Sequence, residues 1–398
     1  MRFLHLIPTV DPAGGGVIEG ATQLHRALVE QGHTGEFAST DDPCATHVQE
    51  FTAAPLHALG PSRGRFGYTR RLQPWLRAHA HQYDAVLVNG LWQYVGMAAR
   101  SALVNSTTPY FVFPHGMLDP WFKHRYPLKH LKKWLYWLLA EYHVLRSAKR
   151  VLFTCEEERL LARQSFGLYH CEEAVVSFGT AAPRDDPDLS KEAFLAAFPQ
   201  LRGKRLLLYL GRIHSKKGCD LLIEAFARSC LRDPDVRLAM AGPDQSDWRP
   251  TLEALAQQLG VTERVCWTGM LTGDLKWGAF RSADAFCLPS HQENFGIAVV
   301  EALACGCPVL ISDKVNIWRE IQAARAGFVA PDTLAGTVEM LERWLAVPRP
   351  EWHQMRESAH RCFDEQFRMD QVAQALVRVV HESCKTPLQT LEKRSAHV

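Results

Sequence analysis

The chain contains 398 residues, of which 47% are hydrophobic and 22% charged, and its formal net charge is +2. This composition is typical of a globular protein, and the length allows two or three domains. The small net charge argues against nucleic acid as a partner, and no run of about 18 apolar residues could cross a bilayer. Eleven cysteines are scattered without a C-x-x-C pair, so we expect reduced thiols in a cytoplasmic protein.

The first 180 residues alternate short apolar runs with helical patterns. Residues 2–10 (RFLHLIPTV) predict a buried strand, and residues 17–32 predict an amphipathic helix. Strand patterns then recur at DAVLVNG, PYFVFPHG and KRVLFTC. Because such alternation predicts a parallel sheet covered by helices, we assign residues 1–180 to a first α/β domain.

The stretch 181–190 is rich in Pro and Asp and predicts a linker. Beyond it the alternation restarts, with strand patterns at KRLLLYLGR, VRLAMAGP, RVCWTGML, DAFCLPS and PVLISD. We therefore expect a second doubly wound α/β domain at 191–365 and a last helix at 366–385 that returns to the first domain. In open sheets of this kind ligands bind beyond the carboxyl ends of the strands, so the loops that follow strands are the candidate site.

Two glutamates, Glu293 and Glu301, flank a small and apolar segment (NFGIAVV). Asn-Phe-Gly is a poor helix interior, so we expect a loop that carries Glu293 and a helix that begins near Ile297. One carboxylate then precedes the helix and the other lies about one turn inside it. Such a helix terminus also offers free backbone N–H groups to a polar or anionic ligand.

The segment GRIHSKKG at 211–218 follows a predicted strand and precedes a helix. Arg212 offers a bidentate donor and Lys217 a point charge, which together suit a diphosphate. The alternative is a solvated basic turn, and the bracketing glycines favour phosphate binding over it. The run Gly14–Gly16 lets the backbone approach a ligand closely, but Glu19 stands where a dinucleotide fingerprint needs its third glycine.

His115 and two D-x-D strings are further candidates. His115 lies just past a predicted strand, a position that suits a catalytic group as well as a structural histidine. The strings Asp186-Pro-Asp188 and Asp233-Pro-Asp235 could hold Mg²⁺ or Mn²⁺ against a diphosphate. Each contains proline, so turn formation is the favoured interpretation, and we expect no metal ion.

Residues 121–150 contain eight Lys or Arg against a single acid, Glu141, together with three tryptophans and three tyrosines. This pattern is typical of an interfacial segment that contacts anionic lipid. The alternative is a helix with a basic outer face and an aromatic core face. We favour peripheral contact with the inner face of the cytoplasmic membrane, as an enzyme with a lipid-linked substrate would need.

These motifs together resemble a known family. Glu293-x7-Glu301, GRIHSKKG, Ala241–Pro243 and the N-terminal glycine loop are similar to those of the retaining GT-B glycosyltransferases of glycosyltransferase family 4. The likeness covers nearly the whole chain in the expected order. It implies two Rossmann-like doubly wound domains that face each other across a cleft, with the acceptor side in the first. The co-substrate is then a nucleoside diphosphate sugar, held mainly by the second domain without a metal ion.

The resemblance also implies roles for residues of the second domain. Arg212 and Lys217 match the pair that binds the diphosphate. Glu293 matches the glutamate that contacts the sugar hydroxyls, and Glu301 matches the glutamate that binds the ribose. The other implied donor-binding positions are Gly242, Met270, Asn294, Phe295, Gly296 and Ile297.

In the first domain the resemblance implies that Gly15 and Gly16 form the donor-phosphate loop. His115 matches the active-site histidine near the reacting sugar. With Glu293, Arg212 and Lys217 it completes the implied catalytic set.

The implied reaction transfers a glycosyl group, with retention of anomeric configuration, to a hydroxyl of a glycan or lipid-linked acceptor in envelope polysaccharide synthesis. One alternative is an epimerase or hydrolase of nucleotide sugars, against which the basic aromatic segment at 121–150 argues. Another is a non-catalytic sugar-nucleotide-binding protein, against which the joint presence of His115 and the donor motifs argues. A dinucleotide oxidoreductase is the least favoured alternative, because the glycine fingerprint fails.

Overall fold

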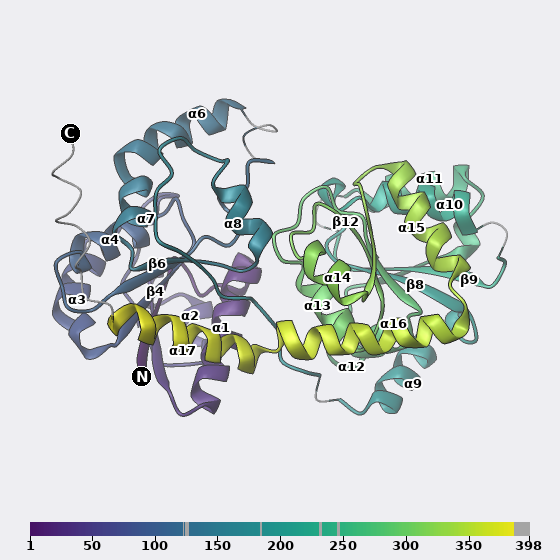
Figure 1. Ribbon diagram of the computed structural model, residues 1–398, viewed down its shortest axis with the longest axis horizontal. Helices are drawn as coiled ribbons and strands as arrows, with labels where there is room; N and C mark the ends of the chain where they lie inside the picture. Colours follow the sequence, from purple (N-terminus) through teal and green to yellow (C-terminus); the bar gives the residue numbers. More distant parts are fainter. Residues whose placement is uncertain (122, 124–126, 184, 231–232, 245–246, 386–398) are drawn as a thin grey trace. The chain divides into compact units, whose positions relative to one another are not determined.

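The computed structural model describes residues 1–385 except 122, 124–126, 184, 231–232 and 245–246. The chain divides into two compact units: Met1–Phe178 together with the chain from Met369 onward, and Gly179–Arg368. Each unit contains one parallel β-sheet with helices on both of its faces (Figure 1).

The first unit is built on a seven-stranded parallel sheet of order β3-β2-β1-β4-β5-β6-β7. The strand order reverses at β1, because β2 lies on one side of it and β4 on the other. The strands are β1 (Arg2–Ile7), β2 (Thr34–Ser39), β3 (Leu56–Ala58), β4 (Ala85–Asn89), β5 (Tyr110–Phe113), β6 (Arg150–Phe153) and β7 (Glu173–Val175). The described α-helices are α1 (Gly16–Glu30), α2 (Thr46–Gln49), α3 (Leu72–His79), α4 (Tyr94–Leu103), α6 (Pro127–Tyr136), α7 (Tyr142–Ser147), α8 (Glu156–Ala162) and α17 (Met369–Lys385).

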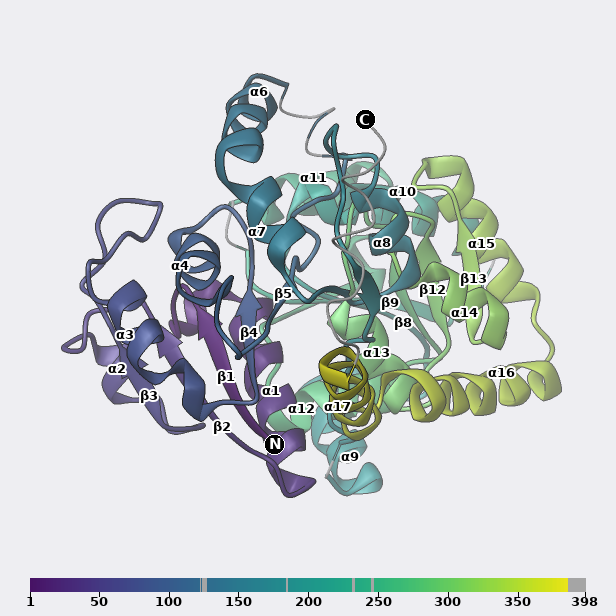
Figure 2. The ribbon, with the colours of Figure 1, turned by 60° about the vertical axis from the view of Figure 1, so that its left-hand side comes forward.

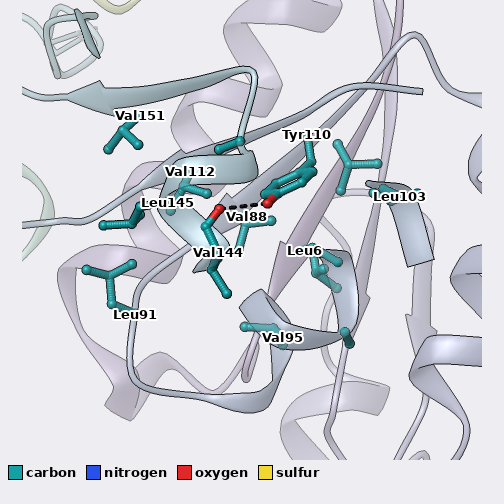
Figure 3. Close-up of a cluster of buried hydrophobic side chains, with 14 of the residues drawn as sticks. Leu6, Val88, Leu91, Val95, Leu103, Tyr110, Val112, Val144, Leu145 and Val151 are labelled. Atoms are coloured by element: carbon teal, nitrogen blue, oxygen red, sulfur yellow. Dashed lines mark hydrogen bonds between the residues drawn. The ribbon is translucent and has the colours of Figure 1, made fainter. Parts of the chain in front are cut away.

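Alternate residues of these strands form an apolar layer on each face of the sheet, because strand side chains point to opposite faces in turn. Leu6, Val88 and Val112 contribute to one layer, which helices α4 and α7 cover (Figure 3). Tyr110 is buried in this layer, and its hydroxyl donates a hydrogen bond to the Val144 carbonyl at 2.6 Å. The polar end of the ring is thereby satisfied inside the core.

The last described helix, α17, packs on the first unit, and Figure 2 shows it beside α1. Its residues Val372, Leu376 and Val380 are buried in one cluster with Leu24 and Leu28 of α1, on the other face of the sheet. An apolar stripe repeating every three or four residues explains why α17 packs here as a helix.

The second unit is built on a six-stranded parallel sheet of order β10-β9-β8-β11-β12-β13. Figure 1 shows α10, α11 and α15 gathered on one side of these strands and α12, α13 and α16 on the other. The strands are β8 (Arg205–Leu210), β9 (Val236–Ala241), β10 (Val265–Gly269), β11 (Ala285–Leu288), β12 (Val309–Ser312) and β13 (Gly327–Ala330). The described α-helices are α9 (Pro187–Ala197), α10 (Cys219–Ser229), α11 (Arg249–Gln258), α12 (Gly273–Ser282), α13 (Ile297–Ala304), α14 (Trp318–Ala324), α15 (Leu334–Ala346) and α16 (Arg349–Cys362).

Part of the predicted linker is helical instead. The Asp186 side chain accepts hydrogen bonds from the N–H groups of Asp188 and Leu189 at 2.9 and 3.1 Å, and so caps α9. Pro187 occupies the first turn, where its missing N–H costs nothing. Residues 187–190 of the predicted linker therefore begin a helix, because Asp-Pro starts a helix here rather than a turn.

Candidate functional site

The strand order of the second sheet reverses between β8 and β11. These strands are paired with each other, whereas the chain leaves β8 for β9 on its other side. In open parallel sheets such a reversal separates the loops at the carboxyl ends and leaves room for a ligand there. The two loops at this point are 211–218, which follows β8, and 289–296, which follows β11.

Glycines let the loops at this edge approach each other closely. Gly218 has φ 67°, and a Cβ on it would lie 2.2 Å from the Pro289 carbonyl oxygen. Gly242, which follows β9, has φ 137°, and a Cβ there would lie 1.8 Å from the Gly211 carbonyl oxygen. Both positions therefore require glycine for backbone contact within the protein.

Lys217 and Glu293 meet between these two loops. The Lys217 ammonium donates a hydrogen bond to Glu293 Oε2, and 15% and 20% of the two side chains remain exposed. The Glu293 carbonyl accepts from the Asn316 N–H at 3.0 Å, which fixes its loop. Arg212 is exposed at the start of the loop after β8, and its carbonyl accepts from the Tyr209 hydroxyl at 2.7 Å. The structure thus brings a paired cation and carboxylate to the edge where strand order reverses.

Helix α13 begins at Ile297, which confirms the prediction from Asn-Phe-Gly. Gly296 precedes it with φ 75°, a left-handed conformation that favours glycine. Phe295 is buried and its ring packs edge-on against Phe367, with centroids 5.7 Å apart. A ligand at this edge therefore meets Phe295 through its backbone. The Asn294 amide oxygen accepts from Asn316 Nδ2 at 3.3 Å.

Glu301 lies in the second turn of α13 and is paired with Lys276 of α12. Lys276 Nζ donates to Glu301 Oε1 at 2.7 Å, and the side chains are 24% and 11% exposed. Sequence analysis does not identify Lys276, because it stands within a helix and belongs to no motif. Met270, a further predicted donor-binding residue, follows β10 and is far more exposed than Glu301, at 69%.

His115 follows β5 in the first unit and is hydrogen-bonded to the end of β4. Its Nε2 lies 3.1 Å from Asn89 Oδ1, while Asn89 Nδ2 donates to the Leu87 carbonyl at 3.1 Å. The amide oxygen therefore faces the imidazole, so Nε2 carries the proton and Nδ1 is left as an acceptor. The ring lies between Phe113 and Phe178, and desolvation lowers the pKa of His115 to about 4. The imidazole is consequently neutral at pH 7.

A buried glutamate of α8 fixes the backbone of the His115 loop. Glu158 Oε1 accepts from the Gly116 N–H at 2.5 Å, and Oε2 accepts from the Thr154 N–H and hydroxyl at 2.7 Å. These bonds hold His115 at φ 50°, a conformation that few non-glycine residues adopt.

The N-terminal glycines lie at the carboxyl end of β1, where the order of the first sheet reverses. Gly15 has φ 76°, and α1 begins at Gly16. A Cβ on either residue would meet no other described atom within 4 Å. Packing within the described part of the unit therefore does not demand glycine at Gly16, and the backbone here is open to approach by a ligand.

Within the basic aromatic segment, residues 127–147 form α6, a π-helical turn at Trp137–Glu141, and α7, whereas residues 122 and 124–126 lie outside the described part of the chain. Among its described residues four large apolar side chains are exposed; three of them, spaced four residues apart, lie along one face, and the fourth lies beside them. They are Leu131 (66%), Trp134 (43%), Leu135 (59%) and Leu139 (72%), hereafter the exposed row. Among the helices that the structure describes, none is long and apolar enough to pass through a bilayer.

The single acid of this segment, Glu141, lies on the protein side of the helix. It is 1% exposed, and its Oε2 accepts from the Trp92 N–H at 3.3 Å. Burial raises the pKa of Glu141 to about 8. Lys133 Nζ lies 4.5 Å from the centre of the Trp92 ring, so this lysine also faces the protein.

Both units match known protein families. Residues 15–179 match the Glycosyl transferase 4-like domain, and residues 190–361 match Glycosyl transferases group 1. The two parallel sheets are those of the GT-B fold. The chain therefore belongs to the group 1 glycosyltransferases with the GT-B fold.

Several known proteins resemble the chain. The D-inositol 3-phosphate glycosyltransferase of Actinosynnema mirum is 32% identical over 187 residues, which cover 44% of this chain and 43% of that protein. Anabaena HepE in complex with UDP and glucose has a TM-score of 0.73 at 18% identity, covering 96% of this chain and 100% of that chain. WaaG, a glycosyltransferase involved in lipopolysaccharide biosynthesis, has a TM-score of 0.65 at 19% identity, covering 96% and 99%. The chain spans between 37% and 43% of the length of the first curated relatives that it matches.

Proposed function

We propose that the protein is a retaining glycosyltransferase that moves a sugar from a nucleoside diphosphate sugar to a hydroxyl of a glycan or lipid-linked acceptor. The pairing of Lys217 with Glu293, where the strand order of the second sheet reverses, carries this proposal. A cation and a carboxylate on neighbouring loops suit a donor in which a diphosphate adjoins a sugar. HepE was solved with UDP and glucose, which supports a UDP-sugar as the donor.

The two cations have a role in the reaction because negative charge grows on the leaving diphosphate. Arg212 and Lys217 would stabilise the leaving diphosphate as its negative charge grows, and they would do so without a metal ion. Glu293 would hold the sugar hydroxyls and Glu301 the ribose hydroxyls. With Glu301 at the ribose, the two-carboxylate mechanism of glycosidases fits poorly. We therefore favour transfer on one face of the sugar, in which the acceptor hydroxyl loses its proton to the leaving phosphate.

The neutral state of His115 suits a hydrogen-bonding role beside the reacting sugar. Its Nε2 proton is engaged by Asn89, so Nδ1 would accept a hydrogen bond from a hydroxyl of the substrate. Gly15 and Gly16 would offer their backbone to the donor phosphate, as the resemblance implies.

We also propose that residues 121–150 contact the anionic inner face of the cytoplasmic membrane, where a lipid-linked acceptor is presented. The exposed row supports this contact, because an amphipathic helix binds an interface by burying such a face beside basic side chains. Lys132 is exposed beside the row. WaaG is involved in lipopolysaccharide biosynthesis, which supports a role in envelope polysaccharide synthesis.

Incubation with a panel of nucleotide sugars tests the proposal. We expect one donor to release its nucleoside diphosphate faster when an acceptor is added, and proton NMR to show that the product keeps the anomeric configuration. The Glu293→Gln variant should lose turnover. Release that no acceptor changes would indicate a hydrolase, conversion of the sugar without release would indicate an epimerase, and binding without turnover would indicate a binding protein.

A further inference from the structure

Both carboxylates assigned to the donor are paired with a lysine, and the second lysine lies outside every sequence motif. Glu293 is paired with Lys217 of the loop after β8. Glu301 is paired with Lys276 of α12, a helix that connects β10 to β11. The two pairs therefore differ in where they lie: the first joins two loops, and the second joins two helices.

Two contacts fix the ammonium group of Lys276. Its Nζ donates to Glu301 Oε1 at 2.7 Å and also lies 4.3 Å from the centre of the Trp277 ring. The first is a charge-assisted hydrogen bond, and the second is a cation–π contact. Glu301 is buried, with 8% of the whole residue exposed, and the lysine provides a polar partner for its carboxylate there.

We propose that Lys276 is a positioning residue for the nucleotide: it orients the Glu301 carboxylate to accept hydrogen bonds from the two hydroxyls of the donor's ribose. This inference rests on the proposed function. Vicinal hydroxyls present two O–H donors, and a carboxylate presents two oxygens that accept them. A carboxylate whose rotamer is fixed before binding loses less side-chain entropy when the ribose arrives.

The pair differs from a solvent-exposed ion pair on another helix of this unit. Arg343 and Glu339 of α15 are 3.6 Å apart with side chains 49% and 60% exposed, and such pairs contribute little to stability or binding. The Lys276–Glu301 pair is shorter and less exposed, and Glu301 lies in the helix whose first turn adjoins Glu293. Low exposure alone is shared with the Arg281–Asp185 pair at 2.8 Å, so the position of Glu301 in α13, next to the Glu293 loop, is what favours a role at the donor.

The test compares a ribonucleoside diphosphate with its 2′-deoxy counterpart by isothermal titration calorimetry. The probes are UDP, ADP and GDP with dUDP, dADP and dGDP, and the pair whose ribonucleotide binds most tightly is used. We expect Lys276→Met to weaken ribonucleotide binding about tenfold, because the hydrogen bond between the ribose 2′-hydroxyl and the charged Glu301 carboxylate is lost. Binding of the deoxyribonucleotide, which lacks that hydroxyl, should change less than about twofold. Lys276→Arg keeps the charge and should restore most of the discrimination. Arg343→Ala is the matched control and should change neither affinity.

Three results would overturn the inference. Equal weakening of both nucleotides in Lys276→Met would show that the lysine acts on the fold or on another part of the donor. Equal binding of the ribonucleotide and the deoxyribonucleotide by the wild type would show that Glu301 does not contact the ribose 2′-hydroxyl. Failure of the wild type to bind any of the three ribonucleotides would refute the proposed function, and this inference with it.

Discussion

Replacing Lys217 by methionine removes the ammonium at the proposed diphosphate site and keeps most of the apolar stem. A charge-assisted hydrogen bond is worth about 1.5–3 kcal/mol, which corresponds to about a 10- to 150-fold loss of affinity. The substitution also leaves Glu293 without this partner. Breaking a fully buried ion pair costs about 3–5 kcal/mol, but with 15% and 20% of these side chains exposed we expect a smaller loss of stability.

Calorimetric titration with UDP measures the binding loss, and thermal unfolding measures the stability loss separately. Combining Lys217→Met with Glu293→Gln should recover stability, because the unpaired carboxylate is gone, without recovering affinity. Lys204→Ala is the matched control, since Lys204 forms an exposed ion pair with Asp235 at the amino ends of the strands. If Lys217→Met and Arg212→Ala both bind UDP as tightly as the wild type, loop 211–218 is not the phosphate site.

Three further predictions concern the membrane, pH and metal ions. Replacing the three leucines of the exposed row by serine should abolish sedimentation of the protein with anionic vesicles at low salt. The control Leu189→Ser, which changes an equally exposed leucine of the second unit, should have no effect. If the wild-type protein fails to sediment with these vesicles, the membrane proposal is refuted. Glu141 is neutral in the folded state up to about pH 8 but ionises near pH 4.5 when unfolded, so the free energy of unfolding should fall by at most about 3.5 kcal/mol between pH 5 and pH 8. Glu141→Gln should flatten that part of the profile, and identical profiles would contradict the assigned pKa. Transfer activity should persist in excess EDTA, because Arg212 and Lys217 would neutralise the diphosphate in the proposed site, and a loss that Mn²⁺ restores would establish a metal-dependent reaction.

Much of the architecture could be predicted from the sequence, because parallel strands buried on both faces are continuous apolar runs between helical patterns. The run RFLHLI is β1 and RLLLYL is β8, each at the point where strand order reverses. The beginning of α13 at Ile297 was also predictable, since Asn-Phe-Gly cannot continue a helix. Asp186-Pro187 did not reveal the start of α9, because the same dipeptide suits a turn and a capped helix start.

The predicted site was incomplete where side chains meet from distant segments. Lys276 and Glu301 are 25 residues apart on different helices, and no periodicity reveals that they touch. The exposed row could not be predicted from the sequence for a related reason. Leucines and aromatic residues occur all round the helices of 121–150, so the sequence alone does not tell that Trp137 is buried while Leu139 is exposed.

The packing of α17 on the first unit affects the order in which the two units can fold during synthesis. β1 and α1 leave the ribosome before α17, yet only the 17 residues of α17 complete their shared apolar cluster. The second unit is contiguous in sequence and complete at Arg368, so it can fold while the first unit still lacks a helix. Cutting the chain after Phe178 would therefore yield a first unit with an uncovered face that tends to aggregate, whereas Gly179–Arg368 retains all its strands.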